Sequence, residues 1–278
     1  MNSVYEVAKK SFDNNYFVEA LTDNESNKEQ IKSFSGGPKG AGLEYNLKSN
    51  GWIEMEKGNS IYYLVKDRKT HEIASYFSIK CGLLYEPQHY EQLESEDKDF
   101  VDLLADAIER NDNKAITNYK ASELYTIDKF EELYQDAIEK LRAKEDKRSS
   151  NSFNVQCTHS AIEVENLCRN HNYKSSKNSI SPIGFQTFWL AVVPIIERVA
   201  SLIGCRYAYL FAADCTKTLH LVEYYRDRFG FESMADLSIS VIRPNYDEDC
   251  IEMFSSVKEL ITQQTFIWDQ FADLYGLV

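Results

Sequence analysis

The sequence predicts a mixed α/β fold in which helices flank a mostly antiparallel sheet. Residues 161–231 follow the order strand, loop, helix, strand, helix. Residues 60–84 contain two runs rich in β-branched and aromatic residues around a polar turn, which is typical of an antiparallel hairpin. Between these segments, residues 86–150 carry helical periodicity and an acidic excess, which predicts a helical insertion between the third and fourth strands.

Length and composition predict one large domain over residues 1–278. Hydrophobic residues make up 43% of the chain and aromatic residues 13%, which excludes a disordered chain. Uninterrupted apolar runs stay well short of the ~18 residues of a membrane span, and the N-terminus lacks a signal-peptide apolar core. The six cysteines form no C-x-x-C pair, so we expect free thiols, a cytoplasmic protein, no membrane contact and no metal site.

The first strands are predicted from short apolar runs. Residues 16–21 form a candidate opening strand, and residues 60–66 and 73–84 form the hairpin around the turn Asp67–Glu72. The glycine-rich loop at 35–42 lacks the G-x-x-x-x-G-K-[ST] spacing and has no strand directly before it, which argues against a nucleotide site there.

The insertion carries two amphipathic helices, at 99–110 and 126–142, followed by a charged linker at 144–151. Its net charge is −8, against −5 for the rest of the chain. Such acidity favours a cationic amine or a basic protein as partner and makes nucleic acid unlikely, although it also fits a surface that simply maintains solubility. A lid, a partner surface and a decorative cap are all compatible with this pattern.

The second half of the chain contains the remaining core. We expect a strand at 161–168, a polar loop at 169–181, a helix at 184–203 bent at Pro194, a strand at 205–213 and a helix at 219–231. A strand at 237–243, a turn at 244–250 and a helix from 254 to about 275, within a docking segment 254–278, complete the chain.

This order resembles the core of the GNAT superfamily, the acetyl-CoA-dependent N-acetyltransferases. The resemblance covers residues 60–84 and 153–243. It implies a GNAT-like fold, coenzyme A as cofactor, and a loop after the fourth strand that cradles the pyrophosphate. The 65-residue insertion departs from the plain family pattern, in which the third and fourth strands are joined tightly.

Two carboxylates mark the fourth strand. Glu163 and Glu165 share one face because side chains alternate along a strand, and their burial would be costly unless that face meets water or a cation. The resemblance places the general base at Glu163, with Glu165 as a second base or an amine-recognition group. A strand bulge would exchange these roles, and both carboxylates reaching solvent at a sheet opening is the alternative.

The resemblance also implies a cofactor site. Backbone amides of Leu167, Cys168 and Arg169 would hold the acetyl carbonyl and pantetheine arm, with Cys168 as a packed thiol. The family pattern [RQ]-x-x-G-x-[GA] is matched only by one glycine in residues 179–184. There, Ser181 is a candidate N-cap ahead of Pro182. The expected phosphate contacts are the amides of Ile183, Gly184 and Phe185, and the charge of Lys174 or Lys177.

A tyrosine motif completes the resemblance. Residues 224–231, with Tyr225 five positions before Gly230, are similar to the family's A-x-x-x-Y-x-x-x-G-F helix, although the spacing is one residue longer. The implied role is proton donation to the coenzyme A thiolate, by Tyr225 first and Tyr224 second. A tyrosine that only packs in the core is the alternative.

Together these features predict an acetyl-CoA-dependent N-acetyltransferase that acts on a primary amine of a small cationic molecule, peptide or protein. Two alternatives are an inactive GNAT-like module that binds a protein, and a toxin-like GNAT that acetylates aminoacyl-tRNA. The sequence does not set the oligomeric state, and a homodimer is one option.

Overall fold

The computed structural model describes residues 3–87, 89–122, 124–145, 155–174, 181–213, 218–234, 239–243 and 250–275, and only the backbone of 143–145 and 273–275. The chain divides into two compact units. The first unit comprises residues 1–84, 159–237 and 241–278, and the second comprises residues 85–158 and 238–240. The second unit therefore contains the whole acidic insertion predicted at 86–150.

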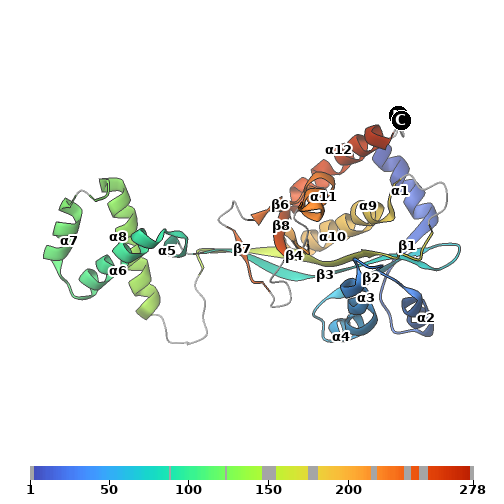
Figure 1. The fold of residues 1–278 in the computed structure, drawn as a ribbon, viewed down its shortest axis with the longest axis horizontal. Helices are drawn as coiled ribbons and strands as arrows, with labels where there is room; N and C mark the ends of the chain where they lie inside the picture. Colours follow the sequence, from blue (N-terminus) through green and yellow to red (C-terminus); the bar gives the residue numbers. More distant parts are fainter. Residues whose placement is uncertain are drawn as a thin grey trace. The chain divides into compact units, whose positions relative to one another are not determined.

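Within the described residues, one mixed sheet has eight strands in the order β1-β2-β3-β4-β5-β8-β6, and β7 pairs with β3 outside this order. The strands are β1 (Tyr16–Ala20), β2 (Ile61–Asp67), β3 (Ile73–Glu86), β4 (Cys157–Arg169), β5 (Tyr207–Ala212), β6 (Glu232–Ser233), β7 (Ser240–Val241) and β8 (Ile251–Ser256). The pairs β1–β2, β2–β3, β5–β8 and β6–β8 are antiparallel, whereas β4 and β5 are parallel. The mixed, mostly antiparallel sheet with flanking helices is thereby confirmed (Figure 1).

In the first unit, helices cover both faces of the sheet (Figure 1). One face carries α1 (Val4–Asn15), α9 (Ile183–Thr187), the π-helical segment η2 (Phe188–Val192), α10 (Val193–Ile203), α11 (His220–Phe229) and α12 (Val257–Tyr275). The other carries α2 (Glu25–Ser33), α3 (Ala41–Tyr45), the π-helical segment η1 (Asn46–Asn50) and α4 (Gly51–Glu56). Each layer has its own apolar cluster, so the sheet is buried on two sides.

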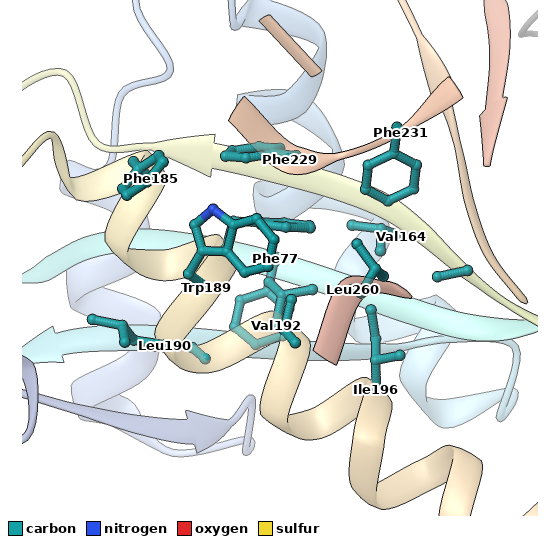
Figure 2. Packing of buried hydrophobic residues seen from close by; sticks show 14 of the residues in the cluster. Phe77, Val164, Phe185, Trp189, Leu190, Val192, Ile196, Phe229, Phe231 and Leu260 are labelled. Carbon is teal, nitrogen blue, oxygen red and sulfur yellow. The ribbon is translucent and has the colours of Figure 1, made fainter. Parts of the chain in front are cut away.

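The larger cluster lies under the core helix at residues 183–203. Figure 2 shows Phe185, Trp189 and Val192 from this helix among Phe77, Val164, Phe229 and Leu260 of other elements. By length and apolar composition this helix could cross a membrane, yet half of its most apolar window is buried, as in the core helix of a folded domain. The absence of membrane contact stays a prediction.

The turn before Pro194 accounts for the proline within this helix. The N–H of Val193 bonds the carbonyl of Phe188, five residues back, so the turn there is π-helical. Pro194 has no N–H to donate, and the wider hydrogen-bond spacing of the π-helical turn accommodates this. Pro194 then stands in the first turn of α10, where proline is tolerated. The helix ends at Gly204, which has the left-handed conformation that glycine adopts without strain.

The amino-terminal third is more helical than the sequence indicated. The strand expected at 16–21 is β1, and the hairpin expected at 60–84 is β2–β3, with a register shift between Val65 and Lys66. In the turn, the Asp67 side chain accepts hydrogen bonds from the N–H groups of Lys69 and Thr70. Helices α1 and α2 were not predicted, although Ser3 and Asn24 cap them through side-chain oxygens and were visible signals.

The second unit is helical, as predicted. It contains α5 (His89–Gln92), α6 (Ser95–Glu109), α7 (Asn113–Ala121) and α8 (Ile127–Glu145). Helices α6 and α8 confirm the amphipathic pair and bury Phe100, Leu104 and Leu133 against each other. Leu103 of α6 is exposed, whereas Val101 and Leu104 lie on the buried stripe at helical spacing.

The carboxyl-terminal prediction was wrong in one respect. Residues 254–256, expected in a helix, belong to strand β8, which pairs with β5 from Tyr207↔Ser256 to Ala212↔Ile251. Helix α12 begins at Val257, because the Ser256 side chain caps it: the Glu259 N–H donates to Ser256 Oγ, and that hydroxyl donates to Glu259 Oε2. The strand expected at 237–243 is shorter, since β7 covers only Ser240–Val241 and residues 235–238 lie outside the described chain.

Candidate active site where β4 and β5 part

The parallel strands β4 and β5 pair over three positions only, from Ala161↔Tyr207 to Glu163↔Tyr209. Beyond Glu163, β4 continues to Arg169, and β5 continues beside β8 to Ala212. The β4 backbone from Val164 onward therefore has no partner on the β5 side within this described register. Backbone N–H and C=O groups that lack a strand partner can bind an extended amide-containing ligand.

The side-chain alternation of β4 changes at the same place. Ile162, Val164 and Leu167 pack against the larger cluster, which requires one extra residue between positions 164 and 167. Glu165 and Asn166 both bond the Ser78 hydroxyl on the opposite face. An extra residue of this kind is a β-bulge, which kinks a strand and redirects its side chains. The predicted shared face of Glu163 and Glu165 is confirmed, since the bulge follows both.

Glu163 is the most buried carboxylate of this face, with 3% of its surface exposed. Its Oε1 lies 3.2 Å from the ammonium of Lys80, and its Oε2 accepts a hydrogen bond of 2.8 Å from the Tyr209 hydroxyl. Burial raises the pKa of the Glu163 carboxyl and Glu165 adds to that rise, whereas Lys80 and Tyr209 oppose it. The Lys80 ammonium therefore offsets the free-energy cost of burying the Glu163 charge, as we expected from the sequence.

Lys80 also bonds the second carboxylate. Its ammonium lies 3.3 Å from Glu165 Oε1, while Glu165 Oε2 accepts a hydrogen bond of 3.2 Å from Ser78. Asn166 donates to Ser78 at 2.7 Å and accepts from Asn46 of η1 at 3.1 Å. The two carboxylates therefore belong to a polar network that reaches the helical layer of α3 and α4. The sequence did not identify Lys80, although a lone charge in a long apolar strand was the available signal.

Gly82 makes room for Tyr209. A Cβ atom on Gly82 would lie 2.7 Å from Tyr209 Cζ and nearer still to the phenolic oxygen, a separation that real Cβ atoms do not show. Only glycine at this position lets the β5 tyrosine lie across the sheet and reach Glu163. Neither Gly82 nor Tyr209 was singled out by the sequence.

The two candidate tyrosines of α11 differ in exposure. Tyr225 packs against the larger apolar cluster, with its ring centroid 5.6 Å from that of Phe229. Tyr224 is 38% exposed. Burial, with contributions from Tyr224 and Cys168, raises the pKa of the Tyr225 hydroxyl, so it stays protonated at neutral pH.

The residues expected to contact the cofactor differ in how far they are exposed. Leu167 is half-buried at the bulge, Cys168 is buried, and Arg169 is exposed. Burial raises the pKa of the Cys168 thiol to about 11, which fits a packed, neutral side chain. Lys174 is exposed, and Lys177 lies outside the described residues.

The start of the core helix differs from the prediction. Pro182, with extended backbone angles, is the residue that flanks the helix, so Ser181 is not its N-cap and the helix begins at Ile183. The Phe185 ring is buried against Trp268 and Phe271, which leaves only its backbone for a ligand. Gly184 is open, since a Cβ atom there would meet nothing within 4 Å. Helix N–H groups beside an open glycine suit the phosphates of coenzyme A.

No family model matches the chain, and no curated protein matches it. Similar solved structures include AtaTR bound with acetyl-CoA (10% identity, TM-score 0.48, 89% of this chain and 97% of that one). Another is AtaT complexed with acetyl-methionyl-tRNAfMet (10% identity, TM-score 0.44, 89% of this chain and 98% of that one). A third is a KacTA–DNA complex (10% identity, TM-score 0.47, 90% of this chain and 98% of that one).

At this level of identity, these likenesses concern the fold alone, and the ligands belong to those proteins. The expectation that nucleic acid is an unlikely partner finds no support in structures that contain tRNA or DNA, and it stays a prediction. The chemistry considered for this chain rests on its own β4–β5 geometry.

Proposed function

We propose that this protein is an acetyl-CoA-dependent N-acetyltransferase that acts on a primary amine. The observation that supports the proposal most is the parting of β4 and β5 directly beside a buried, ion-paired carboxylate. The opening provides backbone groups for an extended thioester cofactor, and the carboxylate provides a proton acceptor. Direct acyl transfer to an amine needs a positioned thioester and a proton acceptor, and the strand edge and the carboxylate can supply these two.

Each residue has a proposed role. Coenzyme A supplies the acetyl thioester when it is bound. The β4 amides at Leu167 to Arg169 orient it and donate to the carbonyl oxygen as negative charge develops there. Glu163 removes the proton from the attacking amine, and Tyr225 donates a proton at the departing sulfur. Glu165 binds the amine, Tyr224 is the second choice as acid, and Ile183, Gly184, Lys174 and Lys177 contact phosphate.

The charge of the face indicates the acceptor class. With Glu163 and Glu165 ionised and Lys80 protonated, the three side chains carry one net negative charge. One further ammonium neutralises it, so the site favours a singly charged primary amine over a neutral or acidic acceptor. We place this reaction in the cytoplasm, because Cys81, Cys157, Cys168, Cys205 and Cys250 are free thiols.

Isothermal titration calorimetry with coenzyme A tests the proposal. We expect micromolar affinity, about −8 kcal/mol, typical of a metabolite site. The variant Gly184→Asp tests the position of the phosphates. It adds a negative charge where phosphate should bind, and it should weaken coenzyme A affinity at least tenfold. Absence of heat and of a thermal shift at millimolar coenzyme A would refute the enzyme assignment and favour a protein-binding module.

Product analysis then separates the acceptor classes. Acetyl-CoA would be supplied with alkyl diamines, basic peptides or aminoacylated tRNA, and products identified by mass. Selective acetylation of the diamine or peptide supports a cationic acceptor, whereas acetylation of aminoacylated tRNA alone would refute the preference inferred from charge.

A further inference from the structure

Lys80 holds the two glutamates of β4 together. Its single ammonium lies 3.2 Å from Glu163 Oε1 and 3.3 Å from Glu165 Oε1, and its side chain is 20% exposed. An ammonium has three donors, so one lysine head group can serve both carboxylates at once. The three side chains therefore form one electrostatic unit rather than two separate pairs.

Both oxygens of Glu163 are engaged by different elements. Lys80 of β3 bonds Oε1, and Tyr209 of β5 donates to Oε2 at 2.8 Å. Contacts from strands on either side fix the plane of the carboxylate. Gly82 is part of this arrangement, because any larger residue would displace the Tyr209 ring.

Glu165 is anchored from a third direction. Ser78 donates to its Oε2, and Asn166 fixes Ser78 through a bond of 2.7 Å. Glu165 is also more exposed than Glu163, at 17% against 3% of the side chain. Glu165 is therefore held by β3 through both of its oxygens, while part of its side chain stays in contact with solvent.

We infer that Lys80 and Tyr209 are positioning residues for Glu163, and that Glu165 is the second negative charge that Lys80 balances. When Glu163 takes up a proton, Lys80 and Glu165 remain as a neutral pair, so no uncompensated charge is left buried. The catalytic meaning of this arrangement rests on the proposed function. The arrangement itself is a property of the ligand-free protein and is testable without cofactor or acceptor.

The test is a carboxyl titration by nuclear magnetic resonance on protein labelled at the glutamate side-chain carbon. Glu163→Gln and Glu165→Gln identify the two resonances by their disappearance. The titratable groups that face Glu163 are Lys80 from β3, Glu165 on β4 and the neutral phenol of Tyr209 from β5. Each substitution of these three residues predicts a sign for the change in the Glu163 midpoint.

Lys80→Met should raise the Glu163 midpoint by about 1–3 pH units, because an opposite charge at this distance lowers it by that much. Lys80→Arg keeps the charge and should restore the wild-type midpoint. Lys48→Met is the matched control, since it breaks a different ion pair, that of Lys48 with Glu44 at 2.7 Å. An unchanged midpoint in Lys80→Met, or an equal shift in Lys48→Met, overturns the inference.

Two further variants decide the question if Lys80→Met does not fold. Tyr209→Phe removes a donor to the ionised form and should raise the Glu163 midpoint, whereas Glu165→Gln removes a like charge and should lower it. Shifts of the same sign, or none, overturn the inference. Intact opposite shifts in a protein that fails to bind coenzyme A would refute the proposed function alone.

Discussion

Gly82→Ala is the most informative single substitution at this site. The new methyl would lie 2.7 Å from Tyr209 Cζ, so the ring must move or remain under strain. If the ring moves, the buried bond to the Glu163 carboxylate is lost, at about 1.5–3 kcal/mol for a hydrogen bond to a charged group. If it stays, overpacking costs a similar amount, about 1–3 kcal/mol. Replacing glycine within a strand returns about 0.5–1 kcal/mol, which leaves a net loss of up to about 2.5 kcal/mol.

Urea denaturation of a double-mutant cycle measures this effect. In a Tyr209→Ala background the obstructing ring is absent, so Gly82→Ala should become neutral or slightly stabilising. Gly42→Ala is the control, because a Cβ atom there meets nothing within 4 Å and the residue lies in α3, where alanine stabilises by up to about 1 kcal/mol. An equal cost for Gly82→Ala with and without the tyrosine ring would refute the steric reasoning.

Four other substitutions or treatments test the remaining assignments. Glu163→Gln should lower turnover by about 10²–10⁴-fold at neutral pH, with a deficit that shrinks as pH rises and the amine deprotonates unaided; equal turnover of both proteins across pH 6–9 argues against a base. Tyr225→Phe should lower kcat while coenzyme A affinity, followed by calorimetry, stays unchanged; Tyr224→Phe should have the smaller effect, and the reverse order would exchange their roles. Because burial raises the pKa of Cys168 to about 11, iodoacetamide at pH 8 should modify it far more slowly than exposed Cys81, and equal rates by peptide mass would contradict this packing. Replacing residues 86–150 with a short Gly-Ser linker should preserve coenzyme A binding but raise the acceptor KM, and an unchanged kcat/KM would show that the insertion is decorative.

Strands and core helices with strong apolar periodicity were predictable from the sequence. The positions of β1 to β5 along the chain and the apolar stripe of the core helix follow from local patterns alone. Strand β8 was missed because its apolar residues precede a helix with the same composition, so the pattern seemed continuous. The Ser256 cap marked the boundary, and it is a local signal that sequence reasoning can use.

Cross-strand partners were not predictable. The shared face of Glu163 and Glu165 follows from alternation, but Lys80 is more than 80 positions away in sequence, and only the register of β3 against β4 brings it there. Tyr209 depends likewise on the alignment Glu163↔Tyr209 between parallel strands. The need for a cation near the carboxylates could be inferred from the cost of burying charge, whereas its identity required the fold.

The short pairing of β4 with β5 also makes a mechanical seam. On one side, β1 to β4 form one hydrogen-bonded ribbon, and on the other, β5, β8 and β6 form a second. Three ladder pairs and a hydrogen bond from the Arg206 N–H to the Ser160 carbonyl join the two ribbons among the described residues, and the larger apolar cluster supports the join from one face. Under tension applied across the strands, the sheet should separate first along this seam. A ligand that hydrogen-bonds to both ribbons should raise the force required for separation.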